Sequence, residues 1–513
     1  MVSSNSENNK RVAKNTLFLY FRMILIMLVT LYTSRVILAE LGIKDYGIYN
    51  VVGGVVTMFS FINNCMTTST QRFLTFALGK RDLKRLKDIF ATSLNIHIII
   101  GLLIIFLAET IGLWFVNNKL VISEDRIIAA NWAYQFSILT FCVNIIQVPY
   151  NAVLIAHEKM NIYAYISILE VILKLLIVYL LTIVKTDKLI VYGILVFSVQ
   201  LIIRAIYQFY CKKKFEECKF RLFWNKCLYK QMSSFAGWNL LGSIAWLLQG
   251  QGLNIVLNLF FGPVVNAARG IASQVSSAVM NFISNFQVAL NPQITKSYAS
   301  DNIDNMEKLS YLGIKFSFLL LFTMAFPLCL NINYILHIWL VDVPNYTEIF
   351  IILIMMDSLL GSLFGGPLMT SISATGNIRN YQIFVNSIIL CILPVSYFIL
   401  KLGFDAPSVF CISIIFNLIS GFIRFLFCRS QIGYSLKKYI SRVLLPISMV
   451  SILSLPVPIL LKIYCFRENS FLNTIYLCVI TLFITISISW FFGMTKNERT
   501  AFIATIKNKF QTS

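Results

Sequence analysis

Apolar stretches of about 20 residues recur along the whole chain, and only short polar segments separate them. Each stretch is long enough to cross a hydrocarbon layer ~30 Å thick as a helix. A transmembrane barrel would instead show alternating segments of about 10 residues. Composition agrees, because 58% of the 513 residues are hydrophobic, whereas a soluble chain of this length would divide into domains with polar surfaces. We therefore predict an all-α polytopic membrane protein.

The apolar pattern predicts about fourteen transmembrane helices. The second and eighth are long and are expected to tilt or to continue past the bilayer. The predicted spans cover residues 15–39, 46–78, 89–116, 127–155, 160–184, 189–211, 233–260, 263–295, 309–335, 347–374, 379–400, 406–428, 443–465 and 471–494.

A six-span unit occurs twice, at an offset of about 220 residues. At this offset Gly42 aligns with Gly262 and Arg204 aligns with Arg424. The alternative is that evenly spaced spans align by chance. Repeated halves are typical of secondary transporters, and an even number of spans per half gives both halves the same orientation in the membrane. We predict two six-helix lobes related by a parallel repeat.

The repeat divides the chain into four parts. The predicted boundaries are an N-terminal lobe at 1–211, a basic linker at 212–232, a second lobe at 233–428, and two additional transmembrane helices with a tail at 429–513. The linker contains Lys212, Lys213 and Lys214, and is expected to lie against anionic lipid.

Basic residues are unevenly distributed between the two sides of the predicted bundle. Lys and Arg are concentrated on the side of the two termini, so the positive-inside rule predicts cytoplasmic N- and C-termini. Most of the net charge of +21 is then a topology signal. No nucleic-acid-binding motif accompanies it. The three histidines are far apart in the sequence and the cysteines lack metal-ligand spacing, so neither a metal site nor a cofactor is expected.

Several cations lie within the predicted spans, where an unpaired charge costs about 2.5–3.5 kcal/mol on insertion scales. Such residues either line water, pair with an acid, or extend to the interface. The alternatives stay open for each of Arg22, Arg35, Arg72, Lys174, Arg204, Arg269, Lys315 and Arg424.

Amides and hydroxyls are dense on the second, seventh and eighth spans, which are too polar to face lipid. They either bind helix to helix or form the wall of a hydrated cavity. Guanidinium groups suit phosphate, and amides suit sugar hydroxyls. The candidate substrate-binding residues are the cations Arg22, Arg35, Arg72, Lys174 and Arg269 and the amides Asn63, Gln71, Gln249, Asn254 and Asn281.

Two intramembrane carboxyl groups are candidates for ion coupling, Glu170 and Asp357. Glu170 lies four residues before Lys174 on the same helical face, so a local ion pair is the structural alternative. Asp357 is a candidate to carry a proton or pair a cation, and a packed, hydrogen-bonded carboxyl group is the alternative.

The N-terminal sequence combines Tyr-Thr-Ser-Arg at 32–35, Leu-Gly at 41–42, Asp-Tyr-Gly-Ile-Tyr at 45–49 and Ser-Thr-Gln-Arg-Phe at 69–73. The segments at 147–170 and 268–275 add to this pattern. The chain resembles the Wzx-like polysaccharide flippase branch of the multidrug/oligosaccharidyl-lipid/polysaccharide (MOP) exporter superfamily. The resemblance covers at least the first twelve spans. It is specific enough to indicate the family but does not indicate which glycan is carried.

The resemblance implies two six-helix lobes around a central cavity that move by alternating access. It implies an inner-membrane transporter, not an enzyme, that carries an undecaprenyl-pyrophosphate-linked oligosaccharide to the periplasmic leaflet. Ion gradients and a cationic lumen are part of the same expectation, as are membrane lipids and polysaccharide polymerase or export machinery as partners. Repeat units of O-antigen, capsule or exopolysaccharide are the expected cargo classes.

Three other functions remain as alternatives. A peptidoglycan-precursor flippase shares the expected fold and number of spans. A drug antiporter of the MATE type is disfavoured, because the buried surplus of charge is basic. A membrane oligosaccharide polymerase or ligase is disfavoured by the repeated halves, the short outer loops and the lack of a recognisable catalytic constellation in the sequence.

Overall fold

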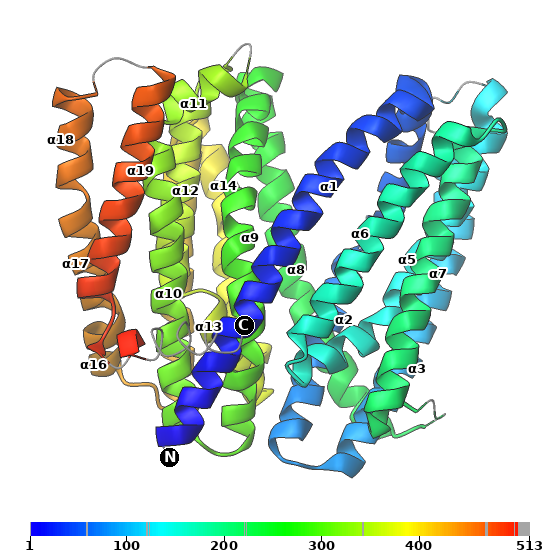
Figure 1. Cartoon of the computed structure of the whole chain (residues 1–513), viewed down its shortest axis with the longest axis horizontal. Coiled ribbons are helices and arrows are strands. Elements are labelled where there is room, and N and C mark those ends of the chain that lie inside the picture. Colours follow the sequence, from blue (N-terminus) through cyan, green and yellow to red (C-terminus); the bar gives the residue numbers. More distant parts are fainter. Residues whose placement is uncertain are drawn as a thin grey trace, which may run out of the picture. The chain divides into compact units, whose positions relative to one another are not determined.

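The computed structural model of the chain describes residues 2–57, 60–118, 122, 124–219, 221, 223–340, 343–466, 470–496 and 498–500. Within these ranges the ordered elements are helices and no strand occurs (Figure 1). The chain forms two compact units. Asn15–Leu240 form one, called the N-unit below. Met1–Lys14 and Leu241–Ser513 form the other, called the C-unit.

The N-unit consists of α1 from Asn15 onward, the helices that follow it, and α8 as far as Leu240. Helices α2, α3 and α7 each pack against α5, and α6 packs against α7. The bounds are α1 (Val2–Thr57), α2 (Ser60–Gly79), α3 (Leu83–Leu107), a π-helical turn (Ala108–Gly112), α4 (Leu113–Asn118), α5 (Ile127–Ala156), α6 (Met160–Ile183), α7 (Lys188–Lys214) and α8 (Lys226–Phe261).

The C-unit repeats this packing and adds a further group of helices. α9 packs against α10, α12 and α13, while α15 packs against α12, α13 and α14. The bounds are α9 (Pro263–Ala299), α10 (Ile303–Leu330), α11 (Ile332–Trp339), α12 (Thr347–Leu363), α13 (Gly366–Thr375), α14 (Arg379–Lys401), α15 (Ser408–Ile432), α16 (Leu436–Tyr439), a π-helical turn (Ile440–Leu444), α17 (Leu445–Ser454), α18 (Pro456–Tyr464) and α19 (Phe471–Ile488).

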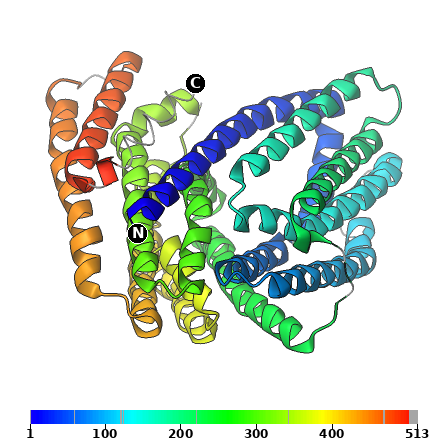
Figure 2. The ribbon, with the colours of Figure 1, turned by 60° about the horizontal axis from the view of Figure 1, so that its bottom comes forward.

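Helices α17, α18 and α19 form the outer edge of the C-unit, in orange and red (Figure 2). They contact one another, and α17 and α19 also pack on α10. These helices correspond to the two spans predicted beyond the repeat. The predicted domain boundaries themselves stay predictions.

The predicted fold class is confirmed. Eleven helices of the described residues are long and apolar enough to cross a membrane. The first, second and eighth predicted spans fall on α1, α2 and α9, which are helical but are not among these eleven. Within α1, the described stretch Asn15–Thr30 is apolar but shorter than the length criterion. Apolar side chains are exposed along many helices, among them Phe106, Ile183, Phe209 and Phe483, which suits a lipid environment.

Backbone details recur at the same offset of about 220 residues. Gly42 and Gly262 have φ of 75° and 76°, a conformation that favours glycine, and each separates two helical segments. Asp82 and Asn302 both cap the next helix by accepting a hydrogen bond from the amide three residues later. These matching bends and caps support the internal repeat.

Several predicted boundaries were wrong by a few residues. The connection predicted at 79–88 is helical from Leu83 onward, because Asp82 caps α3 and Leu86 is buried. The span predicted at 347–374 agrees with the apolar stretch Thr347–Thr375, but its helix is interrupted between α12 and α13 at Phe364 and Gly365. Polar residues at a helix start had been assigned to loops, although the cap was readable in the sequence.

An ion network fixes the bend of α1 in the N-unit. Arg126 donates from Nε to one oxygen of Asp45, at 2.8 Å, and from Nη1 to Asp187, at 2.6 Å. On the other side of Gly42, Lys188 pairs with Glu40 at 2.8 Å. Burial raises the pKa of Asp187, but the hydrogen bond from Arg126 outweighs it, so this pKa lies below its ordinary value.

A buried ion pair fixes the end of the described chain in the C-unit. Lys315 in α10 has a side chain only 3% exposed, and its Nζ lies 2.9 and 2.7 Å from the two carboxylate oxygens of Glu498. The Thr495 amide donates to the same carboxylate at 2.8 Å. The sequence had left anchoring at the interface open for Lys315. Its bonding is instead internal.

We expect Glu498→Gln to lower the thermal unfolding midpoint of the purified protein clearly, because it leaves a buried ammonium without its counter-charge, at a cost of ~3–5 kcal/mol. The matched control is Glu216→Gln, which breaks the exposed pair with Lys87 at 3.0 Å. That control should shift the midpoint little, since exposed pairs contribute little. Equal midpoints for both variants would contradict the structural role of the buried pair.

Candidate functional site

Helices α1 and α6 of the N-unit meet through an arginine and a tyrosine. The Arg22 guanidinium carbon lies 4.6 Å from the centroid of the Tyr163 ring, a cation–π geometry. Its Nη2 is 3.5 Å from the tyrosine hydroxyl. The Nε of Arg22 is buried and has no hydrogen-bond partner among the described residues. This guanidinium therefore retains donor capacity for a ligand or water.

Polar side chains form one stripe along α6, beginning at Tyr163. Tyr163, Ser167, Glu170 and Lys174 are spaced three or four residues apart and so lie on one face. Lys174 Nζ lies 2.6 Å from Glu170 Oε1, and these side chains are 47% and 25% exposed. The local ion pair, left open as the structural alternative, is present, and the side chain of Lys174 stays accessible.

Tyr207 of α7 lies next to Ser167 of this stripe. It is 2% exposed, and its hydroxyl interacts with Ser167 and with the charges of Glu170 and Arg22. We call Arg22, Tyr163, Glu170, Lys174 and Tyr207 the α1–α6–α7 cluster. It holds two cations and one carboxylate, so its formal charge is positive.

Three of the predicted site residues thus lie along α6: Arg22 packs on Tyr163, and the pair of Glu170 with Lys174 lies seven to eleven residues further along the helix. The sequence reasoning missed Tyr163 and Tyr207. Tyr163 could have been found from its place seven residues before Glu170 on the same face. Tyr207 carries no such signal, because its position depends on how α7 packs against α6.

A second polar group lies on α8 and α9 of the C-unit. Arg269 Nη1 donates to the Gly250 carbonyl at 2.9 Å and also to Asn254 Oδ1. Asn254 in turn donates to Gln251 Oε1 at 3.2 Å. Gln249 is buried, and its Oε1 has no partner among the described residues. These residues form the α8–α9 cluster, in which a cation is surrounded by amides.

Asp357 lies on α12, in the same unit. Both of its carboxylate oxygens are 3.0 Å from Nδ2 of Asn417 on α15. Within the described part of the chain it makes no ion pair. The packed, hydrogen-bonded arrangement is therefore what the structure contains.

The remaining predicted residues are dispersed. Arg72 lies 4.6, 5.1 and 5.5 Å from the ring centroids of Phe73, Phe76 and Phe235. Asn63 Oδ1 is buried without a partner among the described residues, Gln71 is half-buried, and Asn281 is exposed. The side chain of Arg35 lies outside the described part of the structure. Over the ranges described, no group of His, Cys, Asp and Glu is arranged to hold a metal ion.

No protein-family model and no curated protein matches the sequence. Solved structures do match. One is an outward-facing MATE family multidrug resistance transporter of the MOP superfamily, at TM-score 0.70 and 14% identity. Another, at TM-score 0.70 and 13% identity, is a MOP superfamily transporter from Pyrococcus furiosus Vc1 (DSM3638). A third is MATE in the straight conformation, at TM-score 0.70 and 14% identity. Each match covers 83% of this chain and 96% of the other.

The chain has the fold of the MOP superfamily transporters. At this identity the likeness concerns the fold alone. The MOP fold and the helices long enough to span a membrane agree with a multi-pass membrane protein.

We expect a cysteine introduced by Lys174→Cys to react with a membrane-impermeant charged maleimide, because the position is polar and exposed. Leu102→Cys, at a 62% exposed apolar position in the helical stretch Leu83–Asn118, is the control and should not react, because we expect hydrocarbon to cover it. Protection of the cysteine at 174 as complete as that at 102 would show that Lys174 is not in contact with water. Mass spectrometry after labelling reads the result, in a background where the exposed native cysteines are replaced by serine at Cys227, Cys391, Cys411 and Cys465.

Proposed function

We infer that the chain moves a lipid-linked oligosaccharide, joined to its isoprenoid carrier through pyrophosphate, from the cytoplasmic to the periplasmic leaflet. The observation that carries the inference is the α1–α6–α7 cluster, where Arg22 and Lys174 lie on neighbouring helices of a MOP-type bundle. The carrier identity, undecaprenyl, comes from the resemblance of the N-terminal motifs to Wzx-like flippases.

The chemistry of the cluster fits an anionic headgroup. Arg22 keeps a donor free, and Lys174 has a single carboxylate partner, so both can bind phosphate oxygens. The ring of Tyr163 holds the guanidinium plane in position. A pyrophosphate would compete with Glu170 for the Lys174 ammonium, which offers a way to bind and then release the cargo.

The amides of the α8–α9 cluster suit the glycan part of the cargo. Gln249 has an unused buried oxygen, and Gln251 and Asn254 present amide groups beside Arg269. Amide donors and acceptors match sugar hydroxyls, whose pattern differs between glycans. Which glycan is carried therefore depends on side chains of this kind, together with Asn63, Gln71 and Asn281.

The charge of the cluster disfavours the transport of organic cations. Such cargo needs a surplus of acidic groups, whereas the α1–α6–α7 cluster has two cations and one carboxylate beside its tyrosines. The solved transporter from Pyrococcus furiosus is described as having a binding pocket of reverse polarity that suggests a different function. The same reasoning applies here and favours an anionic substrate.

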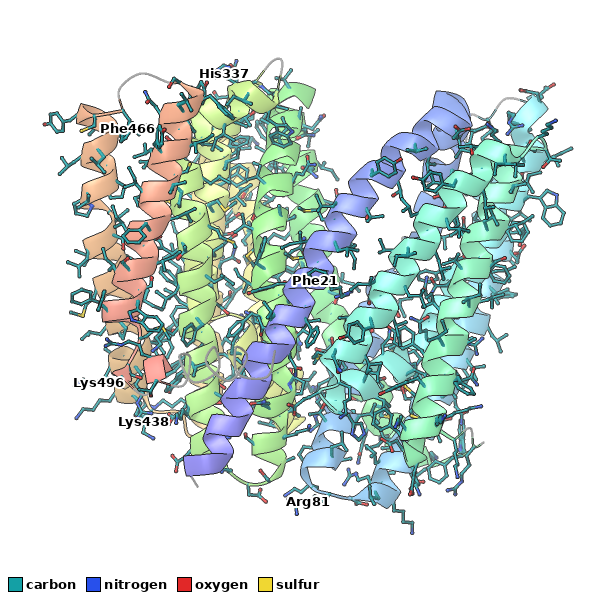
Figure 3. All side chains as sticks on the ribbon, viewed as in Figure 1. Phe21, Arg81, His337, Lys438, Phe466 and Lys496 are labelled. Carbon is teal, nitrogen blue, oxygen red and sulfur yellow. The ribbon has the colours of Figure 1, made fainter. Side chains whose placement is uncertain are left out.

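We also propose the bacterial inner membrane as the location, with both termini cytoplasmic. In the C-unit, Lys438 and Lys496 lie at one end of the helices and His337 and Phe466 at the other (Figure 3). The positive-inside rule assigns the lysine-bearing end to the cytoplasm. Polysaccharide polymerase or export machinery remains the proposed protein partner on the periplasmic side.

Neutralising either cation of the cluster should reduce flipping at least tenfold, because a charge-assisted hydrogen bond is worth ~1.5–3 kcal/mol. The measurement is the amount of lipid-linked glycan on the cytoplasmic leaflet in cells that express Arg22→Gln or Lys174→Gln in place of the native chain. Lys213→Gln, at the exposed end of α7, is the control and should export normally.

Lys174→Gln also leaves Glu170 unpaired, so a double variant, Glu170→Gln with Lys174→Gln, is needed. It should remain defective if the ammonium binds cargo. Recovery of export by the double variant, or normal export by both single variants at matched membrane levels, would overturn the cationic-site proposal. Growth of cells lacking their peptidoglycan-precursor flippase, or efflux of ethidium, would instead support one of the alternative cargoes.

Asp357 is proposed to couple transport to a proton gradient, with Glu170 as the second candidate. Asp357→Asn keeps the side-chain shape but cannot exchange a proton. We expect this variant to fold normally and to lose the acceleration that an imposed pH gradient gives to glycan translocation in vesicles. Ser358→Ala, on the neighbouring position that contacts Ser276 at 3.3 Å, is the control. An undiminished response of Asp357→Asn to the gradient would refute the assignment.

A further inference from the structure

An apolar groove of about 370 Å³ lies between α2, α3 and the first turns of α8 in the N-unit. This volume falls within the ~300–1,000 Å³ of small-molecule sites. None of the predicted site residues lines it. Its walls are formed by aliphatic side chains, including Ile62 and Met66 of α2, Ile96 and Ile100 of α3, and Leu240 of α8.

The groove exists because α8 carries small residues where it faces α2 and α3. Ser233, Ala236 and Gly237 follow one another on one face of the helix and line the groove. A Cβ added at Gly237 would meet no atom within 4 Å, so the space beside it is open. A chain of methylene groups fits such a space without moving the helices.

The groove opens onto a face that contacts lipid. From the lining residue Ile99, which is 53% exposed, α3 continues with Leu102, Leu103 and Phe106, which are 54–64% exposed. A continuous exposed apolar surface on a membrane-spanning helix is covered by hydrocarbon. The occupant of the groove therefore enters from the bilayer.

One end of the groove has the features of a membrane interface. Trp224 is 73% exposed and its ring lies 4.3 Å from that of Tyr229, and both line the groove. Tryptophan and tyrosine prefer the level of the lipid headgroups. The backbone here is fixed to α3, since Asn95 donates to the Phe223 carbonyl at 3.1 Å.

The same end carries positive charge. Lys226 and Lys230 are exposed on the first turns of α8 and make no ion pair within the described ranges. They lie three or four residues before Tyr229 and Ser233, hence on the face that lines the groove. The nearby carboxylates are already engaged, Glu216 by Lys87 at 3.0 Å and Glu217 by His157 at 2.6 Å. An anion at this end would meet two free ammonium groups.

We propose that this groove binds one anionic phospholipid of the surrounding bilayer, with an acyl chain along α2, α3 and α8 and its phosphate between Lys226 and Lys230. The apolar walls take the chain, the two aromatic rings mark the glycerol level, and the unpaired lysines select a net negative headgroup. The lipid fills the space between the start of α8 and the helices α2 and α3. The site is separate from the α1–α6–α7 cluster and does not depend on the transported cargo.

The test uses the full-length protein in nanodiscs of phosphatidylcholine, with phosphatidylglycerol that carries a photoreactive diazirine in its acyl chain. We expect saturable labelling of peptides from α2, α3 and α8. Unlabelled phosphatidylglycerol should compete, and phosphatidylcholine should not. Labelling spread evenly over all lipid-facing helices, or equal competition by both lipids, would overturn the proposal.

Two kinds of variant test the binding of the acyl chain and the binding of the charged headgroup separately. Gly237→Leu fills the groove without a clash and should abolish the labelling of α8. Gly361→Leu, at a helical glycine of α12 whose added Cβ is also unobstructed, is its control. Lys226→Gln should weaken competition by phosphatidylglycerol about fivefold, the factor that corresponds to ~1 kcal/mol per cation. Lys213→Gln is the matched charge control.

Since Lys226 is exposed, its variant remains informative even if Gly237→Leu does not fold. Unchanged competition in Lys226→Gln with Lys230→Gln would refute the headgroup assignment. Undecaprenyl phosphate is included as a further competitor. If it displaces the probe at lower concentration than phosphatidylglycerol does, the groove holds the carrier lipid and the proposal fails.

Discussion

Charges inside the membrane-spanning helices need partners, and this requirement organises both units. Hydrocarbon supplies no counter-charge and no hydrogen bond, so each intramembrane ion must find one within the protein or in water. Lys315 satisfies the requirement completely, through Glu498. Arg269 satisfies it with a carbonyl and an amide. Arg22 packs on the Tyr163 ring, and its Nε, like that of Arg269, has no partner among the described residues. Our proposal places the cargo site at Arg22 because the exposed Lys174 lies on the same neighbouring helix.

The two intramembrane pairs of lysine with glutamate differ in accessibility. Lys315 and Lys174 both pair with glutamate at similar distances. The side chain of Lys315 is 3% exposed, whereas that of Lys174 is 47% exposed. The buried pair holds a terminal segment against α10. The exposed pair is accessible to other ions, and for this reason our proposal assigns it to the cargo site.

Sequence reasoning captured the features that depend on local pattern. The helices, their order and the offset between the halves follow from apolar spacing, and the pair of Lys174 with Glu170 follows from helical periodicity. Contacts between distant segments were beyond its reach. Arg126 binds Asp45 and Asp187 across 81 and 61 residues. Tyr207 likewise joins its cluster only through packing of α7 on α6. One sequence contains no information on such pairings until the helices are placed together.

The bend at Gly42 is held from both sides. Glu40 before it binds Lys188, and Asp45 after it binds Arg126, so two separate ion pairs attach the flanking turns of α1 to the ends of α5 and α7. Straightening the helix at this glycine would pull both carboxylates from their cations at once. A movement of α1 relative to α5 and α7 would therefore need a hinge at another position in the helix. The segment around Gly42 would stay attached to α5 and α7 while the rest of α1 moved.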